Sequence, residues 1–344
     1  MARAETGTGR GGTAICTWFV SDNAGEATYS PQLGQRSDAP KAQAVYWRCT
    51  LCFYASSIIV NPGRRHVFFT NADLPVIDGV AVAHALEQWG VEVVHLPITY
   101  RLPKGAVQSW GSQFYTFDVI SHLARSGTAD RYLILDSDCL WIKSADALEA
   151  ELDREGVLSY LLGTDEYPED MDINGLSRAG LARFLSTMRE GVPATIPYFG
   201  GEFFAATHAE VIALSDALTR VWPKVFRLEP DAPKEDGHML SILFGLGGYR
   251  PGTANPFIRR MWTTFRHNNL RREDAALTLW HLPAEKKAGF AELFRRISEP
   301  THLPMPDALG FDLATYRRAM GIPRRRPAKF VRDFTAKVRE KLRR

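Results

Sequence analysis

The sequence lacks the features that define several broad classes of protein. Its four cysteines are too few for a disulfide scaffold and fit a reducing compartment. No apolar run approaches the roughly 20 residues that a membrane-spanning helix needs, and no apolar segment follows the basic residues near the N-terminus, as it would in a signal peptide. With 344 residues, 45% hydrophobic and 24% charged, we expect a cytoplasmic protein of ordinary globular composition.

Two common phosphate-binding signatures are also missing. Neither GxGxxG nor GxxxxGK[ST] follows any expected strand, which argues against a dinucleotide fingerprint and a P-loop. The pair Cys49 and Cys52 has the spacing of a metal or redox motif, but no second cysteine pair or histidine cluster completes it. We therefore interpret these two cysteines as buried core thiols.

Charge is small overall and uneven along the chain. The net charge is +3, yet residues 324–344 contain ten Lys and Arg against two acidic residues. This pattern predicts a basic amphipathic helix suited to an anionic membrane surface such as the inner membrane face, with a solvated terminal helix as the alternative. Nucleic acid is not expected as a partner, because base-stacking aromatics are not interleaved with the basic residues. The apolar positions recur every four residues, at Phe330, Phe334, Val338 and Leu342.

The most informative segment is the strand-like run that ends in Asp136-Ser137-Asp138. Residues 132–135 are continuously apolar, which is typical of a strand buried on both faces of a parallel sheet. Two carboxylates at the end of such a strand are costly unless their charge is compensated. A divalent cation at the carboxyl edge of the sheet would compensate it. A strand-end turn with solvated aspartates remains the alternative, because Asp-X-Asp is short and common.

Alternating strand and helix patterns predict an α/β fold, an αβα sandwich around a mostly parallel sheet. Besides the central strand, we expect strands at Thr13–Ser21, His66–Thr70, Val91–Leu96 and Val157–Gly163. Helices are expected at Val45–Val60, Ile77–Trp89, Gln113–Ala124, Leu181–Met188, His208–Val221, Gly237–Phe244 and from Leu293 onwards. Two short strands are expected later, at Phe257–Trp262 and Ala276–His281.

Four segments carry a resemblance to a known class of enzyme. They are Asp136-Ser137-Asp138, Tyr198-Phe-Gly-Gly-Glu202, Glu235-Asp236-Gly-His-Met-Leu240 and Trp280-His-Leu-Pro-Ala-Glu-Lys-Lys287. In this order they resemble the motifs of GT-A nucleotide-sugar-dependent glycosyltransferases, in particular the retaining families related to glycogenin, galactosyltransferases and blood-group transferases. The chain departs from the glycogenin-like pattern at Ala284, where that pattern has a glycine.

The resemblance implies a domain organisation and a cofactor. Residues 13–290 would form the catalytic domain, with a nucleotide-binding half at 13–165 and a donor-sugar and acceptor half at 166–290. Residues 1–12 would be a disordered leader, and residues 291–344 a helical extension that ends in the basic tail. The resemblance also implies a UDP-sugar donor and Mn²⁺, or Mg²⁺ in its place, held by Asp136, Asp138 and His281.

Further residues receive expected roles from their chemistry and from this resemblance. Asp236 is the first candidate for the carboxylate that assists the reacting sugar, and Glu202 is the second; helix capping for Asp236 and a solvated loop for Glu202 are the alternatives. Gly200 and Gly201 permit close approach of the backbone to a ligand. Candidates for contact with the nucleotide or its diphosphate are Asn71, Asp73, Arg101, Lys286 and Lys287.

The sequence therefore predicts a metal-dependent glycosyltransferase that moves a sugar from a UDP-sugar to a glycan, a lipid-linked or a small-molecule acceptor, with retention of configuration. Two alternatives remain. A sugar-phosphate nucleotidyltransferase would share the sheet and the acidic metal ligands, but the segment Ser21–Gly25 lacks the glycine-rich basic loop such an enzyme needs. A non-catalytic nucleotide- or sugar-binding protein would bind ligand without turnover.

Overall fold

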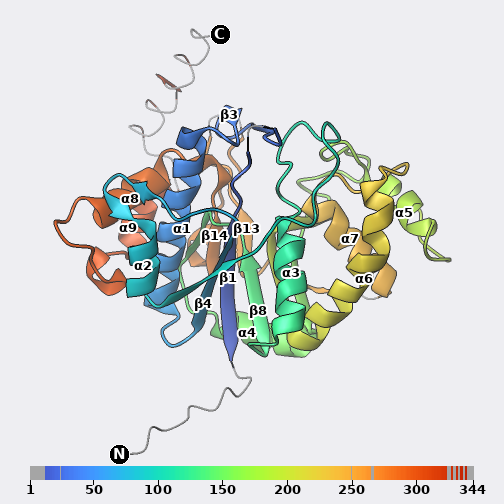
Figure 1. The fold of residues 1–344 in the computed structure, drawn as a ribbon, viewed down its shortest axis with the longest axis horizontal. Coiled ribbons are helices and arrows are strands. Elements are labelled where there is room, and N and C mark those ends of the chain that lie inside the picture. Colours follow the sequence, from blue (N-terminus) through green and yellow to red (C-terminus); the bar gives the residue numbers. More distant parts are fainter. Residues whose placement is uncertain are drawn as a thin grey trace, which may run out of the picture.

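A twisted central sheet organises the protein. The computed structural model describes residues 12–323 except 24, 249, 265 and 266, together with 327, 331, 334, 335 and 338. Within this part the sheet has seven strands and helices on both sides (Figure 1), so the predicted αβα sandwich is confirmed. From edge to edge the strands are β12 (Gly252–Thr253), β10 (Val157–Leu161), β11 (Phe199–Thr207), β8 (Arg131–Leu135), β1 (Thr13–Phe19), β4 (Arg65–Thr70) and β7 (Val91–His95).

One strand of this sheet runs against the others. β8, β1, β4 and β7 are parallel to one another, and β10 is parallel to β12. β11 pairs antiparallel with both β8 and β10. The sheet is thus mostly parallel, as predicted, and the single reversed strand begins at the edge where β8 ends.

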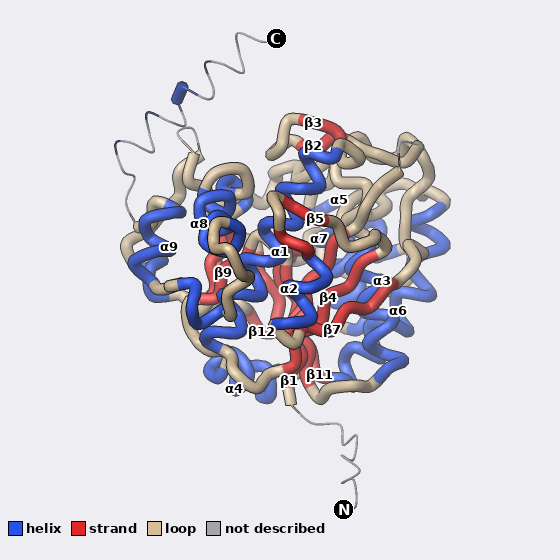
Figure 2. Tube along the Cα trace, turned by 60° about the vertical axis from the view of Figure 1, so that its left-hand side comes forward, coloured by secondary structure: helices blue, strands red, loops and turns tan. Residues whose placement is uncertain are grey.

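The helices form two layers around the sheet. α1 (Pro40–Val60), α2 (Val82–Gln88), α8 (Gly289–Ser298) and α9 (Leu313–Met320) lie on one side. α3 (Tyr115–Ser126), α5 (Arg178–Ser186), α6 (His208–Phe226) and α7 (Asp236–Gly247) lie on the other (Figure 1). Figure 2 shows α1 and α2 over the strands β4 and β7. α4 (Asp146–Glu155) contacts β10, β11 and β12.

The apolar character of α1 follows from its place in these layers. The helix packs against β1 on one side and against α8 on another, so it has little exposed surface along its middle. Cys49 and Cys52 lie in this middle, fully buried, and all four cysteines of the chain are free thiols. The interpretation of the Cys-X-X-Cys pair as core thiols is confirmed.

A small second sheet crosses the end of β8. It consists of β9 (Cys139–Trp141), β14 (Leu279–His281) and β13 (Ile258–Arg260), with β14 antiparallel to β9 and parallel to β13. The two late strands expected from the sequence therefore exist, although each is shorter. Short connecting elements complete the described part: β2 (Tyr29–Ser30), β3 (Gln35–Arg36), β5 (Val76–Ile77), β6 (Val80–Ala81), η1 (Glu273–Ala276), η2 (Pro283–Glu285) and η3 (Pro306–Leu309).

One predicted helix begins later than expected. The pattern placed a helix start at Ile77, but residues 76–81 form the hairpin β5–β6 and the helix begins at Val82. Asp78 and Gly79 at its turn both have positive φ angles, of 49° and 85°. Asp-Gly is a strong signal for a two-residue hairpin turn, and its local preference prevailed over the helical periodicity.

The chain ends lie largely outside the described residues. This applies to residues 1–11 of the predicted leader and to most of the basic tail, including Phe330 and Leu342. Phe334 and Val338 are described and exposed, and the contact with a membrane surface stays a prediction. No described helix has the length and apolar character needed to cross a bilayer.

Stability should depend on pH through His66, a buried residue of β4 whose Nε2 lies 2.9 Å from Ser57 Oγ. Burial lowers the pKa of His66 to about 4, whereas in the unfolded chain it is about 6.5. The unfolded state therefore binds this proton more readily, and stability present above pH 6.5 is lost as the pH falls towards 4. His66→Gln keeps a polar partner for Ser57 but does not titrate. The unfolding free energy of the wild type minus that of the variant should therefore fall by up to about 3 kcal/mol from pH 7 to pH 4.

Urea unfolding at pH 7, 5.5 and 4 measures this difference. A difference that stays constant over the range would contradict the assignment of the titration to His66.

Candidate metal-binding site

The large sheet brings Asp136 and Glu202 together at the end of β8. Phe203 pairs with Leu135 across β11 and β8, and the Asp136 N–H donates to the Glu202 carbonyl oxygen at 3.1 Å. The carboxylates of these two residues therefore begin from neighbouring points of the backbone. Glu202 is buried, whereas the Asp136 side chain is 33% exposed.

The small sheet brings His281 to Asp138 although 143 positions separate them in the sequence. His281 pairs with Cys139 across β14 and β9, which places it next to Asp138. The Leu282 N–H also donates to the Asp138 carbonyl oxygen at 3.0 Å. The remaining strand, β13, pairs Arg260 with His281. Backbone register alone thus gathers three charged side chains from three distant segments.

Asp136, Asp138 and His281 could hold a metal ion. His281 Nε2 lies 3.3 Å from Asp138 Oδ2 and 3.7 Å from Asp136 Oδ2, and the ligand atoms of the three residues all lie within 4.8 Å of one another. When an octahedral cation binds its ligands at roughly 2.1 Å, neighbouring ligand atoms are about 3 Å apart. The spacing of these three side chains therefore suits such a cation. Asp138 Oδ2 is buried and receives no hydrogen bond of good geometry, which fits an oxygen that binds a cation. Two oxygens and one nitrogen favour Mn²⁺, with Mg²⁺ as a substitute.

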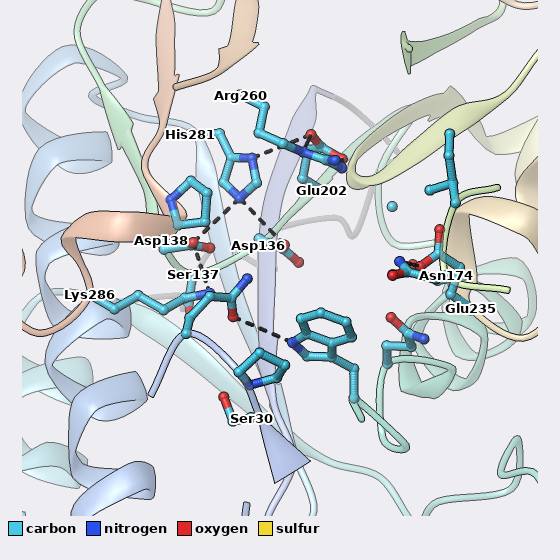
Figure 3. Close-up of a pocket in the computed structure, with 18 of the residues that line it drawn as sticks. Ser30, Asp136, Ser137, Asp138, Asn174, Glu202, Glu235, Arg260, His281 and Lys286 are labelled. Atoms are coloured by element: carbon cyan, nitrogen blue, oxygen red, sulfur yellow. Dashed lines mark hydrogen bonds and ion pairs between the residues drawn. The ribbon is translucent and has the colours of Figure 1, made fainter. Parts of the chain in front are cut away.

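Positive and negative groups alternate through the site (Figure 3). Arg260 donates to both Glu202 oxygens, at 2.7 and 2.6 Å, and Glu202 Oε1 lies 3.4 Å from His281 Nδ1. Burial opposes the ionisation of Glu202, but Arg260 and His281 outweigh it and lower its pKa to about 2. Burial likewise opposes the protonation of His281, yet Asp138 and Glu202 raise its pKa to about 9. A cation that binds Nε2 would displace this proton.

Lys286 adds a further positive charge to the site, next to Asp138. Its Nζ lies 2.9 Å from Asp138 Oδ2 and 5.2 Å from the centroid of the Tyr46 ring. Burial would raise the pKa of Asp138, but Lys286 and His281 hold it well below its usual value. The pKa of Asp136, in contrast, is raised to about 6 by burial and by the charge of Asp138.

Glu235 lies across the cavity from Lys286 (Figure 3), and the next residue, Asp236, is the first residue of α7. Glu235 accepts a hydrogen bond from Asn174, and burial raises its pKa to about 7. Asp236 accepts from the Gly237 N–H at 2.8 Å, and burial followed by the charges of Asp136 and Glu235 raises its pKa well above the usual value. A β-carbon on Gly201 would lie 2.2 Å from the Asp236 carboxyl group, so this carboxyl needs a glycine opposite it.

These groups line one cavity of about 1030 Å³. Its polar lining includes the three residues that could hold a metal ion, together with Lys286, Glu202, Glu235 and Asp236. Small-molecule sites commonly measure about 300–1,000 Å³, so there is room for a large substrate or for two substrates together. Aromatic side chains supply much of the remaining wall: Trp18, Phe19, Tyr29, Tyr46, Trp110, Tyr167 and Trp262.

Seven of the twelve sequence-predicted site residues line this cavity, and five do not. Those that line it are Asp136, Asp138, Gly201, Glu202, Asp236, His281 and Lys286. Gly200 is not part of the lining, but a β-carbon added to it would lie 2.1 Å from the Glu202 carboxylate. The remaining four, which are not in the lining, are Asn71, Asp73, Arg101 and Lys287.

The contacts of these four residues are local. Asn71 hydrogen-bonds the backbone of Ser21 through both its oxygen and its nitrogen, and so joins the ends of β1 and β4. Arg101 pairs with Asp22 at 2.7 Å and with Glu26 at 3.0 Å. Lys287 donates to the Leu33 carbonyl oxygen at 3.2 Å. Asp73 is exposed beyond the end of β4.

Among the polar residues of the cavity that sequence reasoning missed are Arg260, Glu235 and Asn174. A signal existed for Arg260, because two adjacent arginines inside an expected strand must find partners when the strand is buried. Glu235 stood beside Asp236 in the segment that carried the resemblance. Asn174 lies in a loop with a φ of 49°, and no sequence pattern indicated its position.

Comparison with known proteins adds no assignment. No family model matches the chain, and no curated protein matches it.

Removing one ligand should abolish tight cation binding. We expect Asp138→Asn and His281→Ala each to weaken Mn²⁺ binding at least about 100-fold, because each removes a donor atom from a set of three. Calorimetric titration with Mn²⁺ measures the effect. Asp130→Asn is the matched control, since Asp130 is exposed and directly precedes the other end of the same strand, β8. Saturable Mn²⁺ binding that survives in Asp138→Asn would exclude this group as the metal site.

Proposed function

We propose that the protein is a metal-dependent glycosyltransferase of the GT-A class that transfers a sugar from a UDP-sugar to a hydroxylated acceptor with retention of configuration. One observation carries the proposal. A single cavity combines a group that could hold a divalent cation with buried carboxyl groups facing it, at the carboxyl end of a buried parallel strand. Open α/β sheets bind their ligands at this edge.

The leaving group of such a reaction is a nucleoside diphosphate, which carries negative charge away from the sugar. A divalent cation held by Asp136, Asp138 and His281 would stabilise that charge. Lys286 lies beside Asp138 and lines the cavity, so its ammonium group can neutralise a phosphate oxygen as well. Trp18, Phe19 and Tyr46 offer apolar and aromatic surface on which a nucleobase could pack.

Asp236 is the better candidate for the carboxylate that assists the reacting sugar. Both oxygens of Glu202 are occupied by Arg260, and His281 lies against one of them. Glu202 therefore orients the metal-binding histidine and is poorly placed to change partners during a reaction. Asp236 faces the cavity at the start of α7, where its carboxyl group, once ionised, can act on a sugar that develops positive charge.

The acceptor would enter from the side of Asn174 and Glu235. Both residues line the cavity, and together they offer amide and carboxyl groups that suit a hydroxyl. Met171 and Ile173 add apolar surface next to them. Such a mixture suits a glycan, a lipid-linked or a small-molecule acceptor.

The nucleotidyltransferase alternative is disfavoured by the segment after β1. A loop that grips phosphates needs free backbone amides and positive charge. Here Asp22 is buried and pairs with Arg101, and it also accepts a hydrogen bond from Ser37 at 2.7 Å. The charge of Arg101, which comes from the segment between β7 and α3, is thereby neutralised by this loop.

The nucleotide is tested by calorimetric titration of UDP, with GDP and CDP as controls, in Mn²⁺ and then in EDTA. We expect UDP to bind best and to lose its affinity in EDTA and in Asp138→Asn, because the cation links the diphosphate to the protein. Equal binding with and without metal would rule out the metal-dependent mechanism.

Turnover is tested with Asp236→Asn and a panel of UDP-hexoses, by the rate at which UDP is released to water or to an added acceptor. We expect kcat to fall at least about 100-fold while UDP binding in Mn²⁺ is retained, since the carboxylate acts only on the developing charge. Asp130→Asn should keep wild-type kcat. Wild-type protein that binds UDP with metal but releases none from any donor would instead be a non-catalytic binding protein.

A further inference from the structure

Lys286 lies against an oxygen that the cation site would use. Its Nζ is 2.9 Å from Asp138 Oδ2, and His281 Nε2 lies 3.3 Å from the same atom. A divalent cation bound by Asp138 and His281 would therefore be only a few ångströms from the ammonium group. Like charges at such a distance repel strongly in a buried site.

Asp138 is held in place more firmly than Lys286. Asp138 directly precedes β9, and its carbonyl oxygen accepts a hydrogen bond from the Leu282 N–H at 3.0 Å. Lys286 follows η2, and its charge lies at the end of a flexible four-carbon chain that packs against Tyr46. The contact with Asp138 Oδ2 lacks the angles of a good hydrogen bond. The ammonium group can thus leave the carboxylate more easily than the carboxylate can move.

A place for the displaced charge exists within the same cavity. Lys286 and Asp138 both line it, and the cavity is wide enough for a nucleotide beside them. A diphosphate that approaches the cation would bring phosphate oxygens within reach of the lysine, and these are good partners for an ammonium group.

We propose that Lys286 exchanges between Asp138 and an entering diphosphate, so that the lysine opposes binding of the cation alone and favours binding of the cation and the diphosphate together. The diphosphate part of this exchange rests on the proposed function. Such an arrangement makes the two ligands cooperative, because each removes an obstacle to the other.

The direction of the effect makes the proposal testable. Lys286→Met removes the charge and keeps an apolar chain of similar length beside Tyr46. If the lysine opposes the cation, this variant should bind Mn²⁺ alone at least about tenfold more tightly than wild type. Loss of a merely structural ion pair would weaken Mn²⁺ binding instead. Lys143→Met is the matched control, because Lys143 is exposed and follows β9, and it should bind Mn²⁺ like wild type.

The measurement is a Mn²⁺ titration of the full-length chain, monitored by the electron paramagnetic resonance of free Mn²⁺. It is made with no added ligand, with inorganic pyrophosphate and with UDP. We expect pyrophosphate and UDP each to tighten Mn²⁺ binding by a larger factor in wild type than in Lys286→Met. If the Met variant does not fold, Lys286→Gln replaces it, because glutamine keeps a hydrogen-bond donor for Asp138 without the charge. This variant should also bind Mn²⁺ alone more tightly than wild type.

Unchanged or weaker binding of Mn²⁺ alone in the folded variants would overturn the exchange. Cooperativity with pyrophosphate that is equal in wild type and variant would overturn it as well. If pyrophosphate couples through Lys286 but UDP binds no better than pyrophosphate, the exchange is supported and the nucleotide part of the proposed function fails.

Discussion

The site depends on how the charge of four buried acidic residues is compensated around one cavity. Asp138, Glu202, Glu235 and Asp236 are each less than 10% exposed, and Asp136 lies beside them. A buried charge without a partner costs far more than one protein's margin of stability can tolerate. The structure compensates them in different ways: Glu202 and Asp138 are ionised beside cations, whereas burial raises the pKa values of Glu235 and Asp236.

Under the proposed function, this division would separate residues that hold the site in place from residues that take part in the reaction. Arg260 holds Glu202 through two hydrogen bonds, and Glu202 Oε1 lies 3.4 Å from His281 Nδ1, so the carboxylate stands beside the histidine ring in a fixed position. Asp236 is not part of this arrangement and faces the cavity. Lys286 is intermediate between a residue held by its partners and one without such partners, because its charge is paired with Asp138 while its side chain has a flexible chain of four carbons. In the proposed exchange, a lysine that moves beside a fixed set of metal-binding side chains would allow a metal and a polyanion to be taken up together.

Several features were predictable because they arise from local sequence. The apolar run before Asp136 predicted a buried strand, and the polar residues after it predicted a site at the strand end, since a parallel sheet gathers its carboxyl ends at one edge. The buried thiols of Cys49 and Cys52 followed from the lack of further ligands nearby. The hairpin at residues 76–81 was predictable in principle from Asp78-Gly79, but the helical periodicity around it was the more conspicuous pattern.

The sequence by itself determined the order of strands and helices, the acidic end of β8 and the residue types available for the chemistry, because these depend on neighbours along the chain. Only the tertiary structure decided which distant charges meet. The pairing of β14 with β9 brings His281 to Asp138, and that of β13 with β14 places Arg260 beside His281, where it hydrogen-bonds Glu202. Asn71, Asp73, Arg101 and Lys287 have suitable side chains yet lie outside the cavity lining. The physical reason is that the position of a side chain is set, to about an ångström or two, by strand register and loop packing. These depend on contacts between residues far apart in sequence. Residue type specifies only which chemistry that side chain can perform.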